Sequence, residues 1–174
     1  MPDIDVDTAA DSAALSIQER LYPNLPCFGC GQGNPKGLQL KSYAIGEGVV
    51  DGVGEGVGEG VVAAFMPWPE HDNGLGYLNG GIIGTVLDCH SAAAVMLEAE
   101  RRGWPPLPGA DLSYVTAGLD VRYLRPAPLH DRVELFGTVI ESDEPQMTVE
   151  VELHFDGKVR ARATAVWKRW RPRT

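Results

Sequence analysis

One segment of the sequence constrains the fold more than any other. Residues 81–103 form the one long stretch with a convincing helical pattern, and its first half is apolar around the whole circumference of a helix. Apart from Asp88, charged residues enter only near its end, and Gly103 stands where a helix stops. A helix that is apolar on all sides is buried, so other elements must surround it. The apolar residues are Ile82, Ile83, Val86, Leu87, Ala92, Ala93, Val95 and Met96.

The segments on either side of this helix show the alternation of β-strands. Two candidate strands precede it, at residues 38–45 and 61–66, and four follow it, at 112–128, 133–139, 147–155 and 159–167. Asp156-Gly157 is a two-residue hairpin turn between the last two strands. Strands that are segregated from a single helix predict an α+β fold, with an antiparallel sheet wrapped around one long central helix.

The remaining segments set the domain limits. Residues 1–25 are expected to be an acidic, partly disordered N-terminal extension with a weak helical pattern at 11–22, and residues 26–174 a single domain. The Gly/Glu-rich segment 46–60 is interpreted as a hairpin tip between two strands.

Charge and composition exclude several classes of protein. Fifteen basic residues against twenty-four acidic ones give a net charge of -9, which disfavours nucleic-acid binding. The acidic N-terminus lacks the features of a secretory signal, and no apolar run approaches the roughly 20 residues of a membrane span. Three cysteines, an odd number, indicate a reducing compartment. We therefore expect a cytoplasmic protein with no membrane partner.

The predicted helix and two flanking segments resemble a known family. LNGGIIGTVLDCHSAAAV resembles the central helix of the PaaI-like (phenylacetic-acid-degradation type) thioesterases, and CFGCGQGNPKGLQL and LDVRYLRPAPL resemble other segments of the same family. The likeness covers roughly residues 26–170. It implies the hotdog fold, in which an antiparallel sheet wraps one helix, and it implies hydrolysis of an acyl thioester.

The resemblance also implies the roles of individual residues. It places the catalytic carboxylate at Asp88, the backbone N–H that polarises the thioester carbonyl at Gly80, and a loop residue that positions substrate or water at Asn73. It places a hydroxyl partner of the carboxylate at Thr116. The family usually has His where this chain has Asn79, and an Asn can donate a hydrogen bond but cannot titrate.

The residue types themselves are compatible with this chemistry. Gly80 and Gly81 lie at a predicted helix start, where unpaired N–H groups and the helix dipole favour a developing negative charge. Asp88 has no basic residue three or four positions away, so it either acts as a base or nucleophile or pairs with a distant group. His90 projects about 200° from Asp88 and is a candidate for substrate contact, although a core or interface role is favoured.

The spacing of Gly80 and Asp88 predicts an oligomer. Eight residues of helix separate the two positions by about 12 Å along the axis, which is too far for both to reach one carbonyl. Two antiparallel copies of the helix can bring Gly80 of one chain to Asp88 of the other. We therefore expect a two-fold homodimer, which can assemble further into a tetramer.

Two other groups of residues bear on ligands. Cys27-x-x-Cys30 can begin a zinc site, but no second Cys or His pair follows at ligand spacing, so no metal is expected. Arg122 and Arg125 are candidates for the phosphates of coenzyme A, and solvated charge is the alternative interpretation. The same two interpretations apply to Lys168, Arg169 and Arg171.

The sequence thus predicts a thioesterase that acts on an acyl-CoA or acyl-carrier-protein thioester without a cofactor. Two alternatives stay open, a hotdog hydratase or dehydratase and a non-catalytic module that binds acyl thioesters.

Overall fold

The computed structural model describes residues 15–46 and 59–172. Residues 1–14 of the N-terminal extension, expected to be partly disordered, and most of the expected hairpin tip at 46–60 fall outside these ranges. The elements in chain order are α1 (Ile17–Leu21), β1 (Ser42–Ala44), β2 (Val61–Phe65), the 3-10 turn η1 (Pro69–His71), α2 (Gly80–Arg102), β3 (Tyr114–Tyr123), β4 (Val133–Asp143), β5 (Gln146–Phe155) and β6 (Lys158–Arg169).

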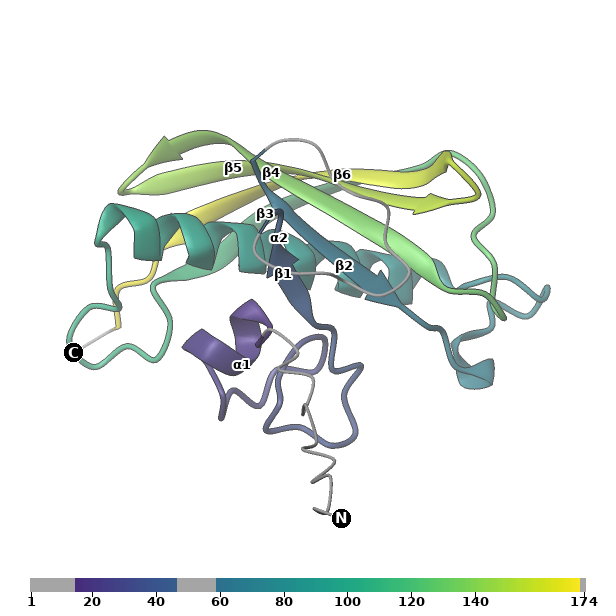
Figure 1. Ribbon diagram of the computed structural model, residues 1–174, viewed down its shortest axis with the longest axis horizontal. Helices are drawn as coiled ribbons and strands as arrows, with labels where there is room; N and C mark the ends of the chain where they lie inside the picture. The colour runs from purple at the N-terminus through teal and green to yellow at the C-terminus, as the bar shows by residue number, and fades with distance from the viewer. Residues whose placement is uncertain (1–14, 47–58, 173–174) are drawn as a thin grey trace, which may run out of the picture.

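The six strands form one antiparallel sheet in the order β1-β2-β4-β5-β6-β3, and this sheet curves over α2 (Figure 1). The predicted order of two strands, one helix and four strands is confirmed. The hairpin at Asp156-Gly157 is also confirmed, since both residues have left-handed φ angles, of 53° and 65°. The first strand is shorter than the predicted 38–45, because Gln39 has a φ of 50° that interrupts an extended backbone.

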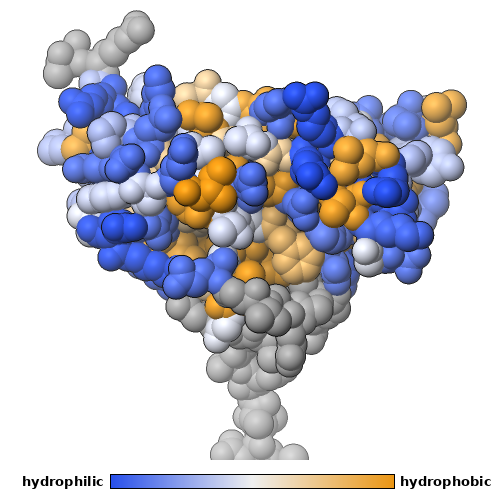
Figure 2. Space-filling model, turned by 90° about the horizontal axis from the view of Figure 1, so that it is seen from above, coloured by the Kyte–Doolittle hydropathy of each residue, from blue (hydrophilic) through white to orange (hydrophobic). Residues whose placement is uncertain are grey.

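Helix α2 lies against the concave face of the sheet. Asn79 caps its first turn, and Gly103, with a φ of 70°, ends it in the left-handed conformation. Alternating side chains of β4, β5 and β6 are buried against the helix, among them Leu135, Val149 and Ala163. The opposite face of the sheet carries many hydrophilic residues, and its hydrophobic residues lie in separate areas between them (Figure 2).

By length and composition alone, α2 is apolar enough to cross a membrane, which our sequence analysis did not expect of any segment. Within the described residues, however, 61% of its most apolar window is buried inside the fold. This burial is the pattern of a core helix, as the circumferential apolarity predicted.

The N-terminal segment covers the side of α2 that the sheet leaves open (Figure 1). Ile17 is part of the hydrophobic core, and the Gln18 side chain accepts a hydrogen bond from the Ser42 N–H at 2.9 Å. The Tyr22 hydroxyl lies 3.2 Å from the Met96 sulfur on α2. Residues of the expected N-terminal extension therefore complete the wall of the domain.

Candidate functional site

Asp88 lies on the side of α2 that meets β3 and the N-terminal segment. The Thr116 hydroxyl on β3 donates a 2.9 Å hydrogen bond to Asp88 Oδ1. None of the salt bridges within the described residues involves Asp88. Burial raises the pKa of this carboxyl, the Thr116 hydrogen bond partly opposes that rise, and the nearby Cys27 adds to it. Asp88 is thus half-buried, and among the residues that the structure describes it has one hydroxyl partner and no counter-ion.

A cavity of about 520 Å³ opens beside Asp88. Its walls come from three parts of the chain, which are the N-terminal segment, α2 and the sheet. Trp167 closes one side, and its indole N–H donates to the Ser91 hydroxyl at 3.0 Å. A mostly apolar cavity with a few polar groups is typical of a small-ligand site. The apolar lining residues include Ile17, Tyr22, Ala92, Met96, Leu112 and Trp167.

The start of α2 distinguishes the two predicted N–H donors, Gly80 and Gly81. The Asn79 side-chain oxygen accepts from the Gly81 N–H at 2.7 Å, so this donor is already used. Gly80 is the first residue of the helix, and its N–H has no acceptor within the helix. The Tyr123 hydroxyl, which sequence reasoning missed, donates to the Gly80 carbonyl at 2.7 Å. Of the two predicted donors to the thioester carbonyl, only the Gly80 N–H is therefore left for a ligand.

Strand β3 contacts both Asp88 and the start of α2. Thr116 near its beginning contacts Asp88, and Tyr123 at its end contacts Gly80. β3 is also an edge strand of the sheet. No pattern in the sequence signalled the role of Tyr123, because only the register between β3 and α2 brings its hydroxyl to the helix start.

Asn73 lies in the loop before α2. Its side-chain oxygen accepts from the N–H groups of Leu75 and Tyr77 at 2.8 and 3.3 Å, while its own N–H donates to the Tyr77 carbonyl at 2.9 Å. This residue holds the loop that leads into Asn79, and only its side-chain NH₂ is left to meet a ligand.

His90 is fully buried on another side of α2. Its Nδ1 lies 2.9 Å from the Ser42 hydroxyl and its Nε2 lies 3.2 Å from the Val61 carbonyl. Burial lowers the pKa of His90 to about 4. The structure therefore places His90 in the core and does not bring it to the cavity beside Asp88.

The candidate phosphate-binding arginines do not gather at the site. Arg122 pairs in register with Arg162, whereas the neighbouring Val121 pairs with the buried Ala163. Since side chains alternate along a strand, Arg122 points to the sheet face opposite α2, where it forms a 3.1 Å ion pair with Asp120.

Arg125 lies two residues beyond Tyr123, at the end of β3 that contacts the start of α2. Its guanidinium is exposed and donates to the Val159 carbonyl at 3.0 Å. Arg169 is held by the Trp104 carbonyl at 2.9 Å, and Lys168 and Arg171 are exposed.

All three cysteines of the chain meet at the same cavity. Cys27 and Cys30 come from the N-terminal loop and Cys89 from α2, one residue after Asp88. Hydrogen bonds from Cys30 and Cys89 lower the pKa of the Cys27 thiol, and donating those bonds raises the pKa of the other two. These thiols are the residues near the site that could hold a metal.

Comparison with known proteins identifies the class to which this fold and site belong. The family model of the thioesterase superfamily matches residues 75–161, from the loop before α2 into β6. The chain therefore belongs to the thioesterase superfamily. A search of curated proteins finds no match.

Solved structures agree with this assignment. A thioesterase superfamily protein from Shewanella loihica is 28% identical, with a TM-score of 0.57 over 80% of this chain and 98% of the other. A phenylacetic acid degradation-related protein from Ralstonia eutropha is 26% identical, with a TM-score of 0.53 over 63% and 75% of the two chains. The PaaI protein of Thermus thermophilus, at 23% identity, has a TM-score of 0.52 over 64% and 85% of the two chains and supports the fold alone. The hotdog fold and the PaaI-like resemblance are thus confirmed.

Proposed function

We propose that this protein hydrolyses acyl-CoA thioesters, with Asp88 as the catalytic carboxylate. Membership of the thioesterase superfamily supports thioester hydrolysis in general. The observation that carries the finer proposal is the position of Asp88, which lies at the wall of an apolar cavity with one hydroxyl partner. The acyl chain occupies the cavity, and the thioester carbon lies next to the carboxylate.

The chemistry needs a donor for the oxyanion as well as an attacking group. Asp88 either removes a proton from the attacking water and passes it to the departing thiolate, or attacks the thioester itself and expels the thiolate. In the second route water then hydrolyses the acyl-Asp88 anhydride, which restores the carboxylate and supplies the proton that the thiolate takes up. The Gly80 N–H, at the positive end of α2, stabilises the negative charge that forms on the carbonyl oxygen. Helix geometry separates Gly80 and Asp88 by about 12 Å along one axis, so the two groups come from different copies of the chain.

Edge strand β3 supports a dimer of that kind. It is ten residues long, and its unpaired side offers backbone groups to another strand. If two copies of β3 pair antiparallel about the middle of the strand, Tyr123 of one copy approaches Thr116 of the other. Because Tyr123 contacts Gly80 and Thr116 contacts Asp88, this pairing brings the start of one helix to the carboxylate of its partner.

The exposed Arg125 at the end of β3 is our candidate for binding the phosphates of coenzyme A. Three cysteines without disulfide bonds suit a reducing compartment, and we place the protein in the cytoplasm for that reason.

The first test is the release of free thiol from a series of acyl-CoA substrates of increasing chain length. Asp88→Asn keeps the shape of the side chain and removes its basicity, so kcat should fall by about 10²–10⁴-fold. Asp131→Asn, at an exposed position, is the matched control and should behave as the wild type. Full activity of Asp88→Asn would refute the mechanism. Tight binding of acyl-CoA by the wild type without turnover would refute hydrolysis.

A second test concerns the shared site. Gly80→Pro removes the N–H but is compatible with the first position of a helix, and Asn79 already has the extended backbone that precedes proline, with ψ of 135°. An added Cβ would lie 3.4 Å from the Tyr123 ring, an ordinary contact. This variant should lose about 10²–10³-fold in kcat.

Co-expression of Gly80→Pro with Asp88→Asn then distinguishes a site shared between two chains from a site formed within one chain. In a shared site, half of the dimers are mixed and each mixed dimer has one intact site, so about a quarter of the wild-type activity returns. If Gly80 and Asp88 of the same chain formed each site, no activity would return. That result would refute the dimer geometry without refuting hydrolysis by Asp88.

A further inference from the structure

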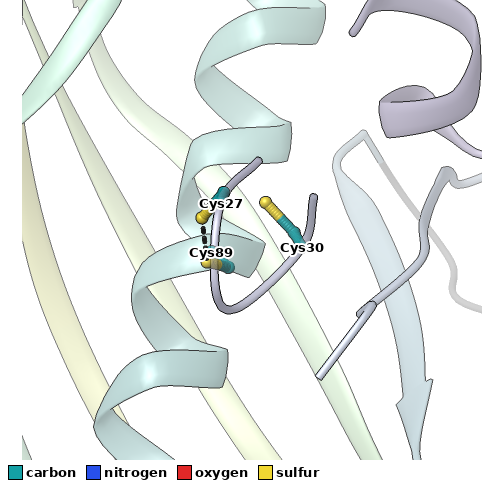
Figure 3. Close-up of side chains that lie close together, drawn as sticks. All are labelled: Cys27, Cys30 and Cys89. Carbon is teal, nitrogen blue, oxygen red and sulfur yellow. Dashed lines mark hydrogen bonds between the residues drawn. The ribbon is translucent and has the colours of Figure 1, made fainter. Parts of the chain in front are cut away.

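We propose that Cys27, Cys30 and Cys89 bind a thiophilic divalent cation of the zinc class. The three sulfur atoms lie within 4.8 Å of one another, and the Cys27 and Cys89 sulfurs are 3.7 Å apart (Figure 3). This site is independent of the proposed hydrolysis, since it uses side chains to which we assign no catalytic role.

The spacing of the sulfurs fits tetrahedral coordination. A Zn–S bond of about 2.3 Å places the sulfurs of two ligands roughly 3.8 Å apart. The 3.7 Å between Cys27 and Cys89 matches that value, and the 4.8 Å limit for the whole set requires only a small rotation of a side chain. Three protein ligands leave a fourth position for water or another small ligand from the cavity that all three cysteines line.

The loop around Cys27 forms a tight turn that packs directly against α2. The Gly31 N–H donates to the Cys27 carbonyl at 2.9 Å and closes a tight turn. A Cβ at Gly29 would lie 2.2 Å from the Cys89 sulfur, so the absence of a side chain there lets the turn lie directly on α2.

Charge also favours a cation at this position. No Lys or Arg is among the described residues that line the cavity, while Asp88 lies next to the cysteines. Thiolates in such an apolar cavity need a positive partner, which a divalent ion supplies. A disulfide would use two sulfurs and leave the third without a function, whereas a metal ion uses all three. A bound ion would tie the loop at residues 27–31 to α2 beside Asp88.

The test is metal titration of the full chain, reduced and stripped of metal with a chelator. Titration with Co²⁺ should give thiolate-to-cobalt charge-transfer absorption that saturates at one equivalent, and Zn²⁺ should displace the Co²⁺. Replacing any one cysteine by serine should weaken binding more than about 100-fold, because the loss of an outer partner alone costs roughly 10–100-fold. Phe28→Leu, at an exposed position between the two loop cysteines, is the control and should bind as the wild type does.

A second measurement uses the wild type and does not depend on the folding of variants. A thiol reagent should modify all three cysteines in the metal-free protein, and one equivalent of Zn²⁺ should slow that reaction at all three together. Absence of the charge-transfer band in the reduced wild type would overturn the proposal. So would Zn²⁺ binding that survives Cys89→Ser, or protection of only one cysteine.

Discussion

The hydrogen bond between Thr116 and Asp88 offers a direct test of how the carboxylate is held. Thr116→Val keeps the size and β-branching of the side chain and removes only the hydroxyl that lies 2.9 Å from Asp88 Oδ1. A hydrogen bond to a charged group contributes about 1.5–3 kcal/mol. Thr116 is exposed, so water can partly replace the lost donor, and the lower end of this range applies.

A loss of about 1.5 kcal/mol corresponds to roughly a tenfold change in rate. We expect kcat of Thr116→Val to fall about tenfold in the thiol-release assay, with little change in KM, because the hydroxyl orients the carboxylate and does not bind the acyl chain. Thr116→Ser retains the hydroxyl, so its kcat should stay within about threefold of the wild-type kcat.

Two outcomes would refute this reasoning. Unchanged kcat in Thr116→Val would show that Asp88 does not need its hydroxyl partner. Equal losses in the Val and Ser variants would show that packing, and not the hydrogen bond, is responsible. Thermal unfolding of both variants serves as the control for stability, since an exposed Thr should change the melting temperature little.

Two further predictions concern the core and the cavity. His90→Leu leaves the Ser42 hydroxyl and the Val61 carbonyl without their buried partner. Urea denaturation should therefore show that the free energy of unfolding falls by about 2–4 kcal/mol. The control His130→Leu, at an exposed position, should change that free energy by less than about 0.5 kcal/mol. Ala92→Phe places a ring in the 520 Å³ cavity. The kcat/KM for long-chain acyl-CoA, divided by that for short-chain acyl-CoA, should therefore fall more than about tenfold. An unchanged ratio would show that the acyl chain lies elsewhere.

The sequence was most informative where a pattern repeats over many residues. The strict alternation of residues 147–155 and 159–167 predicted β5 and β6, because one face of a sheet must be buried and the other meets solvent. Local signals were weaker. Leu38 and Leu40 are apolar and buried, yet the left-handed Gln39 between them keeps this stretch out of the strand.

The candidate site was predicted less completely, since its parts are distant in the chain. The resemblance to PaaI-like thioesterases pointed to Asp88 and Thr116, and the structure places the two side chains in contact. The resemblance also pointed to Gly80, and the helix-start argument added Gly81, but the Asn79 cap occupies the Gly81 N–H. Arg122 is one residue from Tyr123 in the chain and points to the opposite face, because strand alternation separates neighbours.

The sequence by itself determined that the long apolar helix must be enclosed, since its apolar surface has to be removed from water. The alternation of the segments on either side identified a sheet as the enclosing element. Only the tertiary structure decided which side chains share a cavity. Cys27-x-x-Cys30 lacked a third ligand in the sequence, and Cys89, 62 residues away from Cys27, supplies it because the N-terminal loop folds onto α2. Contacts of that kind depend on the packing of distant segments, which local periodicity does not encode.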